Sequence, residues 1–209
     1  DARNLAADSA VVFRTGVGVD AWSENITGKT VPLIDLSSVL EPGMTDGAWL
    51  SFGRAVAMSR LIRDTLDMTY PSYKERFDAR YASLVEECSR ADGRLKQLIW
   101  KASNRAFVAA DTTWSDAARD YGLRIVVQSA LKTLDLGSTD TAATITAWGA
   151  AEATHVAILD LSPEGSLGID QRIKGAVVCY LDAMGKTASD SFVSWLEGQL
   201  TLLGSALGM

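Results

Sequence analysis

The feature that most constrains the fold is a change in the spacing of apolar residues near position 45. Before it, residues 1–42 contain short apolar runs such as Val11-Val12-Phe13 but no helical repeat. After it, apolar residues recur three and four positions apart, most regularly at Tyr73, Phe77, Tyr81, Leu84 and Cys88. Spacing of this kind places one apolar stripe along a helix. It therefore predicts that amphipathic helices make up most of the chain after residue 45.

Capping residues and helix breakers divide this region into segments. We expect helices to begin at Thr45 or Asp46, at Pro71, and again after an interruption at Asp92-Gly93. Further helices are expected over about 115–137, 142–161, 170–184 and 189–203. The sequence thus predicts an all-α fold, a single bundle of six to seven helices over 43–209. An extended N-terminal arm over 1–42 precedes it, with room for one or two short β-strands.

Composition places the chain among ordinary globular proteins. Of its 209 residues, 47% are hydrophobic and 22% charged, and the net charge is −6. These values exclude a collagen-like, wholly disordered or disulfide-framework protein. Its two cysteines, Cys88 and Cys179, lie among apolar residues, which favours buried thiols over a bridge. No apolar run is long enough to span a membrane, so we expect a soluble protein and leave its compartment open.

Residue types that carry catalysis or bind metals are scarce. The only histidine is His155, and the two cysteines lie 91 positions apart, so no zinc site of ordinary spacing can be drawn. Glu152 and His155 form one Glu-x-x-His step, whereas a di-iron bundle needs two. We therefore expect no catalytic residue, no metal ligand and no cofactor, and a protein that is not an enzyme.

Charge is distributed unevenly along the chain. Residues 1–53 and 106–209 carry net charges of −4 and −6, whereas residues 54–105 carry +4. Cations in this middle segment recur near helical spacing, which makes them a candidate nucleic-acid surface. The candidate residues are Arg76, Arg80, Arg90, Arg94, Lys101 and Arg105. Solvent, or acids elsewhere in the chain, could equally neutralise such a stripe.

Three classes of function remain open on these observations. The favoured hypothesis is a structural subunit of coat or nucleocapsid type, which assembles with copies of itself through the arm and holds nucleic acid in the basic segment. The second is a helical subunit of a larger complex that binds a ligand or partner in a pocket lined by some of its six tryptophans. The least favoured is an enzyme that uses carboxylates or an unrecognised cofactor site. Asp116 and Asp120 share a helix face, but their position near a helix start favours a structural role.

Overall fold

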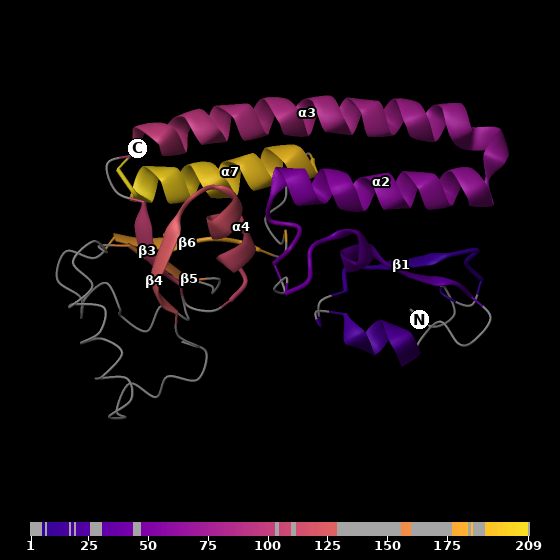
Figure 1. The fold of residues 1–209 in the computed structure, drawn as a ribbon, viewed down its shortest axis with the longest axis horizontal. Helices are drawn as coiled ribbons and strands as arrows, with labels where there is room; N and C mark the ends of the chain where they lie inside the picture. Colours follow the sequence, from indigo (N-terminus) through magenta and orange to yellow (C-terminus); the bar gives the residue numbers. More distant parts are fainter. Residues whose placement is uncertain are drawn as a thin grey trace. The chain divides into compact units, whose positions relative to one another are not determined.

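The chain divides into two units, Asp1–Arg90 and Ala91–Met209, and each is described by itself. Figure 1 shows the elements of both in a computed structural model. The structure describes residues 6, 8–16, 18, 20–25, 31–43, 47–102, 105–109, 112–128, 156–159, 177–183, 185 and 191–208. The predicted division into an arm over 1–42 and a domain over 43–209 stays a prediction.

The first unit begins with two short parallel strands. Strand β1 (Val12–Arg14) pairs with β2 (Leu33–Asp35), with Phe13 opposite Ile34. The 3-10 helix η1 (Ala21–Asn25) lies between them in the sequence, and η2 (Leu36–Val39) follows β2 directly. Two parallel strands need a crossover connection, which is why 18 residues separate Arg14 from Leu33 in the sequence.

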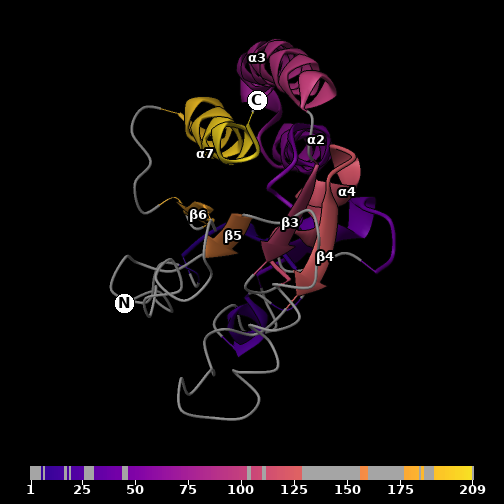
Figure 2. The same cartoon turned by 90° about the vertical axis from the view of Figure 1, so that its left-hand side faces the viewer.

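A helical hairpin completes the first unit. Helix α2 (Phe52–Thr69) is followed by the 3-10 turn η3 (Pro71–Tyr73) and by α3 (Lys74–Lys101). Pro71 cannot donate the backbone hydrogen bond that would continue α2, so the chain turns there and reverses direction. The two helices lie side by side in Figures 1 and 2. Their buried residues include Phe52, Met58 and Cys88.

Among the residues that the structure describes, the second unit is built around a parallel sheet of four strands. They are β3 (Ala106–Ala109), β4 (Arg124–Gln128), β5 (Val156–Leu159) and β6 (Val177–Tyr180), in the spatial order β4-β3-β5-β6. Every pairing is parallel. Helix α4 (Ser115–Asp120) contacts β4, and α7 (Phe192–Ala206) contacts β6 (Figure 2). Helix α7 buries Leu196, Leu200 and Leu203 and so supplies much of this unit's core.

The predicted all-α fold is wrong, because this sheet replaces three of the expected helices. The expected helix over 115–137 ends at Asp120, and Gly122, with a φ of 66°, turns the chain into β4. Those expected over 142–161 and 170–184 contain β5 and β6 instead. Parallel strands buried on both faces form continuous apolar runs, which over four residues cannot be told from a buried helix.

Several expectations about particular segments can be compared with the structure. Helix α3 continues through Gly93, where an interruption was expected, whereas α7 forms close to the expected 189–203. Both cysteines are free and buried, as predicted. Residues 142–155, which include His155, lie outside the described residues. Within the described part of the chain, we find no helix with the length and hydropathy that crossing a membrane requires.

The loop after β1 generates a first prediction. Gly16 has a φ of 81°, and a Cβ there would overlap Asp35 Oδ1 and Ser37 Oγ. Gly16→Ala should therefore displace the Asp35 side chain as well as strain the backbone. We expect the free energy of unfolding to fall by roughly 2–4 kcal/mol, measured by urea denaturation followed by circular dichroism.

Gly18 supplies the matched control for this substitution. Its φ of 92° is similar, but nothing lies within 4 Å of the position a Cβ would take. Gly18→Ala should lower the free energy of unfolding by only about 1–2 kcal/mol, the cost of the left-handed backbone alone. Equal losses in the two variants would contradict the close approach of Gly16 to Asp35.

Strand β6 generates a second prediction. Burial raises the pKa of the Cys179 thiol to about 11, because the thiolate would lose its hydration. Since this pKa lies above the ordinary thiol value of 9.0, the neutral thiol favours the folded state. The corresponding stability is complete below about pH 9 and is lost as the pH rises through 11. We expect the free energy of unfolding to fall less between pH 8 and pH 10 in Cys179→Ala than in the wild type. Urea denaturation of both proteins at the two pH values measures this difference.

Candidate functional site

The sheet order in the second unit identifies one edge as the place where a ligand would bind. The chain forms β3, adds β4 on one side, and then returns to place β5 on the other side of β3. In open parallel sheets, ligands bind beyond the carboxyl ends of the strands, where the strand order reverses in this way. The carboxyl edge next to β3 and β5 is therefore the candidate site.

Asp182 is the described carboxylate that follows a strand at this edge. It comes two residues after β6 ends at Tyr180, between the buried residues Leu181 and Ala183. Its backbone N–H donates to Gln199 Oε1 at 2.7 Å. Gln199 is itself buried on α7. Packing of α7 against β6 thus holds the backbone of Asp182 in place, while its half-buried side chain keeps access to solvent.

A buried carboxylate also follows β3, but it has a structural role. Asp116 lies in the first turn of α4, and its Oδ1 accepts a hydrogen bond from Arg119 Nη2 at 2.6 Å. Its side chain is 2% exposed. A buried carboxylate is stable when it is paired in this way, and a helix N-terminus favours negative charge. Asp116 therefore fits the structural role that its position near a helix start predicts.

Polar side chains also gather at the carboxyl ends of β1 and β2, where they bind one another. Arg14 forms ion pairs with Glu24 at 2.5 Å and Asp35 at 2.8 Å. Partial burial would raise the pKa of Asp35, but hydrogen bonds from Ser37 and Arg14 outweigh it and lower that pKa. Asp20 accepts the backbone N–H of Gly16 at 3.0 Å. This cluster holds the loop in place.

Metal-ligand side chains were expected to be absent from the chain. Among the residues that the structure describes, no group of three or more His, Cys, Asp or Glu side chains could hold a metal ion. The only histidine of the sequence, His155, lies outside those residues. The 209 residues can therefore supply at most one imidazole ligand, and any metal bound by them needs mainly oxygen or sulfur donors.

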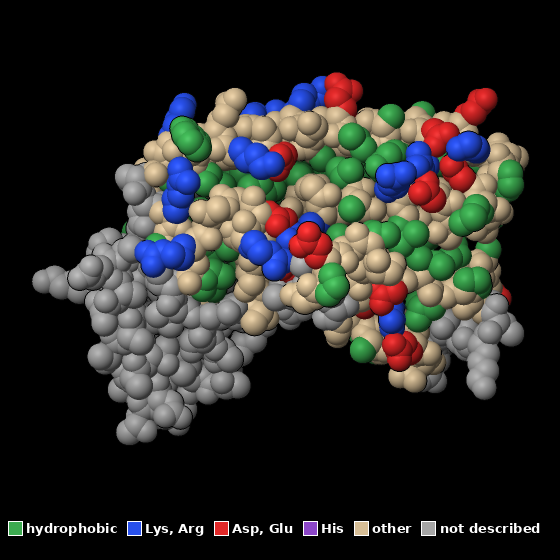
Figure 3. Space-filling model, viewed as in Figure 1, with side chains coloured by type: hydrophobic (Ala, Val, Ile, Leu, Met, Phe, Trp, Pro, Cys, Tyr) green, Lys and Arg blue, Asp and Glu red, His purple; other side chains and the backbone are tan. Residues whose placement is uncertain are grey.

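The six cations predicted to form a basic stripe do not share one environment. Arg90 pairs with Glu86 at 2.6 Å, and Arg94 binds Glu197 through Nε at 2.6 Å and Nη2 at 2.8 Å. The hydrogen bond from Arg94 lowers the pKa of Glu197. Figure 3 shows basic side chains beside acidic ones over α2 and α3. Acids of the same chain thus neutralise part of the expected stripe.

The other four cations are exposed. Arg105 lies beyond the end of α3, where its guanidinium stands 5.7 Å from the centre of the Trp100 ring. Arg76, Arg80 and Lys101 have no ion pair with a described residue. Helix α3 stays helical through Gly93, so Arg90, Arg94 and Lys101 lie on one helix, but Arg105 is not part of it.

The sequence contained a signal for the carboxyl edge that periodicity did not detect. Three times an apolar run is followed directly by aspartate: Ala106–Ala110 by Asp111, Val156–Leu159 by Asp160, and Val177–Leu181 by Asp182. An aspartate that ends an apolar run is typical of the carboxyl end of a buried parallel strand. The runs were assigned to helices or left unassigned, so this repetition was missed.

The chain matches one protein-family model over residues 1–206. That family is described as ZnuA, zinc-uptake complex component A, periplasmic. The match covers nearly the whole chain and therefore includes both units. The description names a component of an uptake complex and names no reaction.

Curated relatives match a shorter segment. The zinc-binding lipoprotein AdcA of Streptococcus pneumoniae serotype 4 is 34% identical over 83 residues, which is 40% of this chain and 17% of the relative. The zinc-binding protein AdcA of Streptococcus pyogenes serotype M3 is 32% identical over 75 residues, 36% of this chain and 15% of the relative. The aligned segments thus span only a small part of these longer proteins.

Solved structures match the fold over almost the entire chain. The Zn(II)-bound ZnuA-like domain of Streptococcus pneumoniae AdcA has a TM-score of 0.80 at 21% identity, covering 99% of this chain and 83% of that one. A periplasmic metal-binding protein from Candidatus Liberibacter asiaticus has a TM-score of 0.78 at 16% identity, covering 98% and 83%. At these identities the likeness concerns the fold.

These comparisons overturn the favoured functional hypothesis. The predictions of a self-assembling coat or nucleocapsid subunit, and of a second copy or a nucleic acid as partner, are wrong, because the matching family is a component of a zinc-uptake complex. The alternative, a helical ligand-binding subunit, assumed a pocket in an all-α bundle, and that architecture is wrong too. The chain belongs to the ZnuA family of periplasmic zinc-uptake components.

Proposed function

We propose that this chain is the substrate-binding component of a zinc-uptake system and binds Zn²⁺ as its cargo. The observation that carries the proposal is the family match over residues 1–206. The fold shared with the Zn(II)-bound domain of AdcA supports it. A binding component needs no catalytic group, and we propose that the chain is not an enzyme. The family's description also supports a location outside the cytoplasmic membrane.

We propose the carboxyl edge of the second unit's sheet as the binding region. Asp182 is the described carboxylate there, and α7 positions its backbone through Gln199. Asp111 and Asp160 follow β3 and β5 in the sequence but lie outside the described residues. Zn²⁺ accepts carboxylate oxygens at about 2.0–2.2 Å as well as imidazole and thiolate ligands. Aspartates are therefore chemically competent to replace the imidazoles that this chain lacks.

The first test of this function is a direct titration. The purified chain, freed of metal with a chelator, should bind one equivalent of Zn²⁺ by isothermal titration calorimetry. Binding should weaken as the pH falls below about 5, because protonated carboxylates do not bind metal. The ZnuA-like domain of Streptococcus pneumoniae AdcA serves as the positive control. Absence of Zn²⁺ binding under conditions in which that domain binds Zn²⁺ would overturn the proposal.

A second test locates the site with matched variants. Asp182→Asn keeps the shape of the side chain but removes its charge, and it should weaken Zn²⁺ binding about 10- to 100-fold. Asp92→Asn is the control, since Asp92 pairs with Lys96 at 2.6 Å on α3. His155→Ala should leave the affinity unchanged, because His155 precedes β5 in the sequence rather than following it. Loss of binding in His155→Ala with full affinity in Asp182→Asn would contradict the proposed region.

A further inference from the structure

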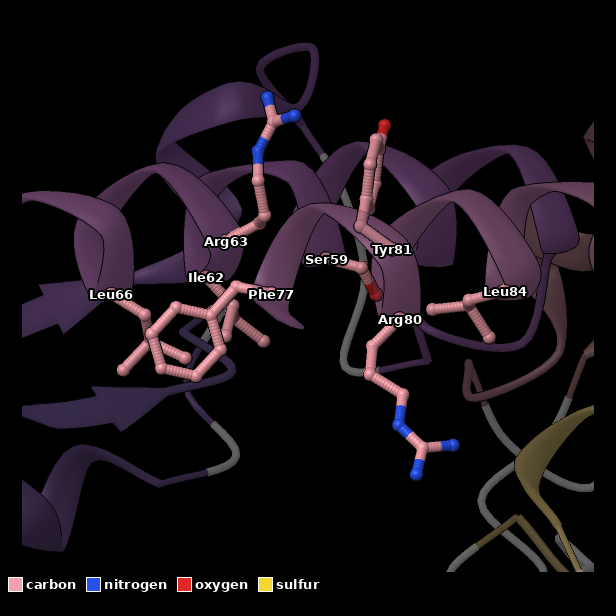
Figure 4. A pocket seen from close by; sticks show the side chains of 8 residues that line it. All are labelled: Ser59, Ile62, Arg63, Leu66, Phe77, Arg80, Tyr81 and Leu84. Carbon is pink, nitrogen blue, oxygen red and sulfur yellow. The ribbon is translucent and has the colours of Figure 1, made fainter. Parts of the chain in front are cut away.

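A groove runs between α2 and α3 in the first unit. Its apolar lining comes from Ile62 and Leu66 on α2 and from Phe77 and Leu84 on α3 (Figure 4). All four side chains are half-buried, so the groove is open to solvent. The residues on each helix are separated by about one or two turns, which places them in two facing rows. This surface has no part in the proposed metal site, which lies in the second unit.

The size of the groove decides what kind of ligand it fits. Its volume is about 210 Å³. Pockets for drug-sized molecules usually measure roughly 300–1,000 Å³ and enclose most of the ligand. A smaller, open groove is better suited to one or two apolar side chains that anchor a protein partner.

Apolar surface continues from the groove toward the turn of the hairpin. The ring of Tyr73 lies 6.3 Å from that of Phe77, centre to centre. Tyr73 is 53% exposed. The first unit thus offers an apolar strip longer than the groove itself, and exposed apolar strips of this kind are typical of interaction sites.

Two unpaired arginines determine the charge that a partner would carry. Arg80 lines the groove, and Arg76 lies one turn before it on α3. Both are exposed, and neither pairs with a described residue. Their neighbour Arg63 differs, because it binds Asp78 at 3.2 Å and stacks on Tyr81. In Figure 4 Arg80 points away from Arg63 and Tyr81. Like charges one turn apart repel, so a carboxylate from outside would relieve that repulsion.

We propose that the groove binds an acidic amphipathic helix of a partner protein. Apolar side chains on one face of that helix would enter between the rows of α2 and α3, as helices bind in the grooves of other proteins. Carboxylates beside those anchors would pair with Arg76 and Arg80. The interaction does not depend on metal binding, so it stands or falls separately from the proposed function.

Designed peptides of opposite charge test this proposal. One fluorescein-labelled peptide of about 16 residues, long enough to form a helix, carries leucines at helical spacing flanked by glutamates. A second peptide has lysine in place of each glutamate. The glutamate peptide should bind the full chain more tightly in fluorescence anisotropy. This ranking is diagnostic, because the net charge of −6 favours the lysine peptide in any non-specific interaction.

Charge-reversal variants locate the contact. Arg76→Glu and Arg80→Glu together should weaken binding of the glutamate peptide roughly tenfold. Arg60→Glu is the matched control, because Arg60 is exposed on α2 and does not line the groove. Ser59→Cys adds a position-specific readout, since Ser59 lines the groove and both native cysteines are buried. A polarity-sensitive dye at residue 59 should shift to shorter wavelength with the glutamate peptide only.

The outcomes that overturn the proposal are equally specific. Equal or tighter binding of the lysine peptide would overturn it. So would an unchanged affinity for the glutamate peptide in the variant with both Arg76→Glu and Arg80→Glu, provided that its circular dichroism matches that of the wild type. Sedimentation with phosphatidylcholine–phosphatidylglycerol vesicles examines a different partner. Binding to vesicles that the double variant abolishes, without binding of the glutamate peptide, would assign the surface to a membrane instead.

Discussion

The parallel pairing of β3 with β5 is the constraint on which the second unit depends. It places the later strands on the opposite side of β3 from β4 and creates the reversal in strand order. Because all four strands run in the same direction, the residues that follow them meet at a single edge. We propose that carboxylates from distant segments meet at this edge, although the sequence has few metal-binding side chains. The buried face of α7 supports this edge through Leu196, Leu200 and the hydrogen bond of Gln199.

Sequence reasoning succeeded where a helix is long and partly exposed. Helices α2, α3 and α7 show an apolar stripe beside polar residues, so their periodicity is readable without a structure. It failed at β5 and β6, because their short apolar runs show no polar alternation that would separate a strand from a buried helix. The switch from α4 to β4 depends on Gly122 in the left-handed region. A single glycine is a weak signal for the end of a helix when the apolar spacing continues beyond it.

The candidate site was harder to predict than the fold. The search for metal ligands looked for histidines and cysteines at short spacing, and the chain has only one histidine. A site assembled from the ends of separate strands has no short motif, because its members are 20 or more residues apart in the sequence. Asp182 becomes a candidate only when β6 is known to end at Tyr180. The ion pair of Arg94 could not be predicted for a related reason, since Glu197, which neutralises it, lies 103 positions away in the sequence.

The measurement that most directly tests the central claim is the X-ray absorption spectrum of Zn²⁺ bound to the purified chain. Binding by carboxylates at the edge of the sheet predicts a first shell of oxygen or nitrogen donors at about 2.0–2.2 Å. It also predicts no sulfur at about 2.3 Å, because Cys88 and Cys179 are buried and the pKa of Cys179 is raised. A shell that contains sulfur would place the metal elsewhere in the chain and contradict the account.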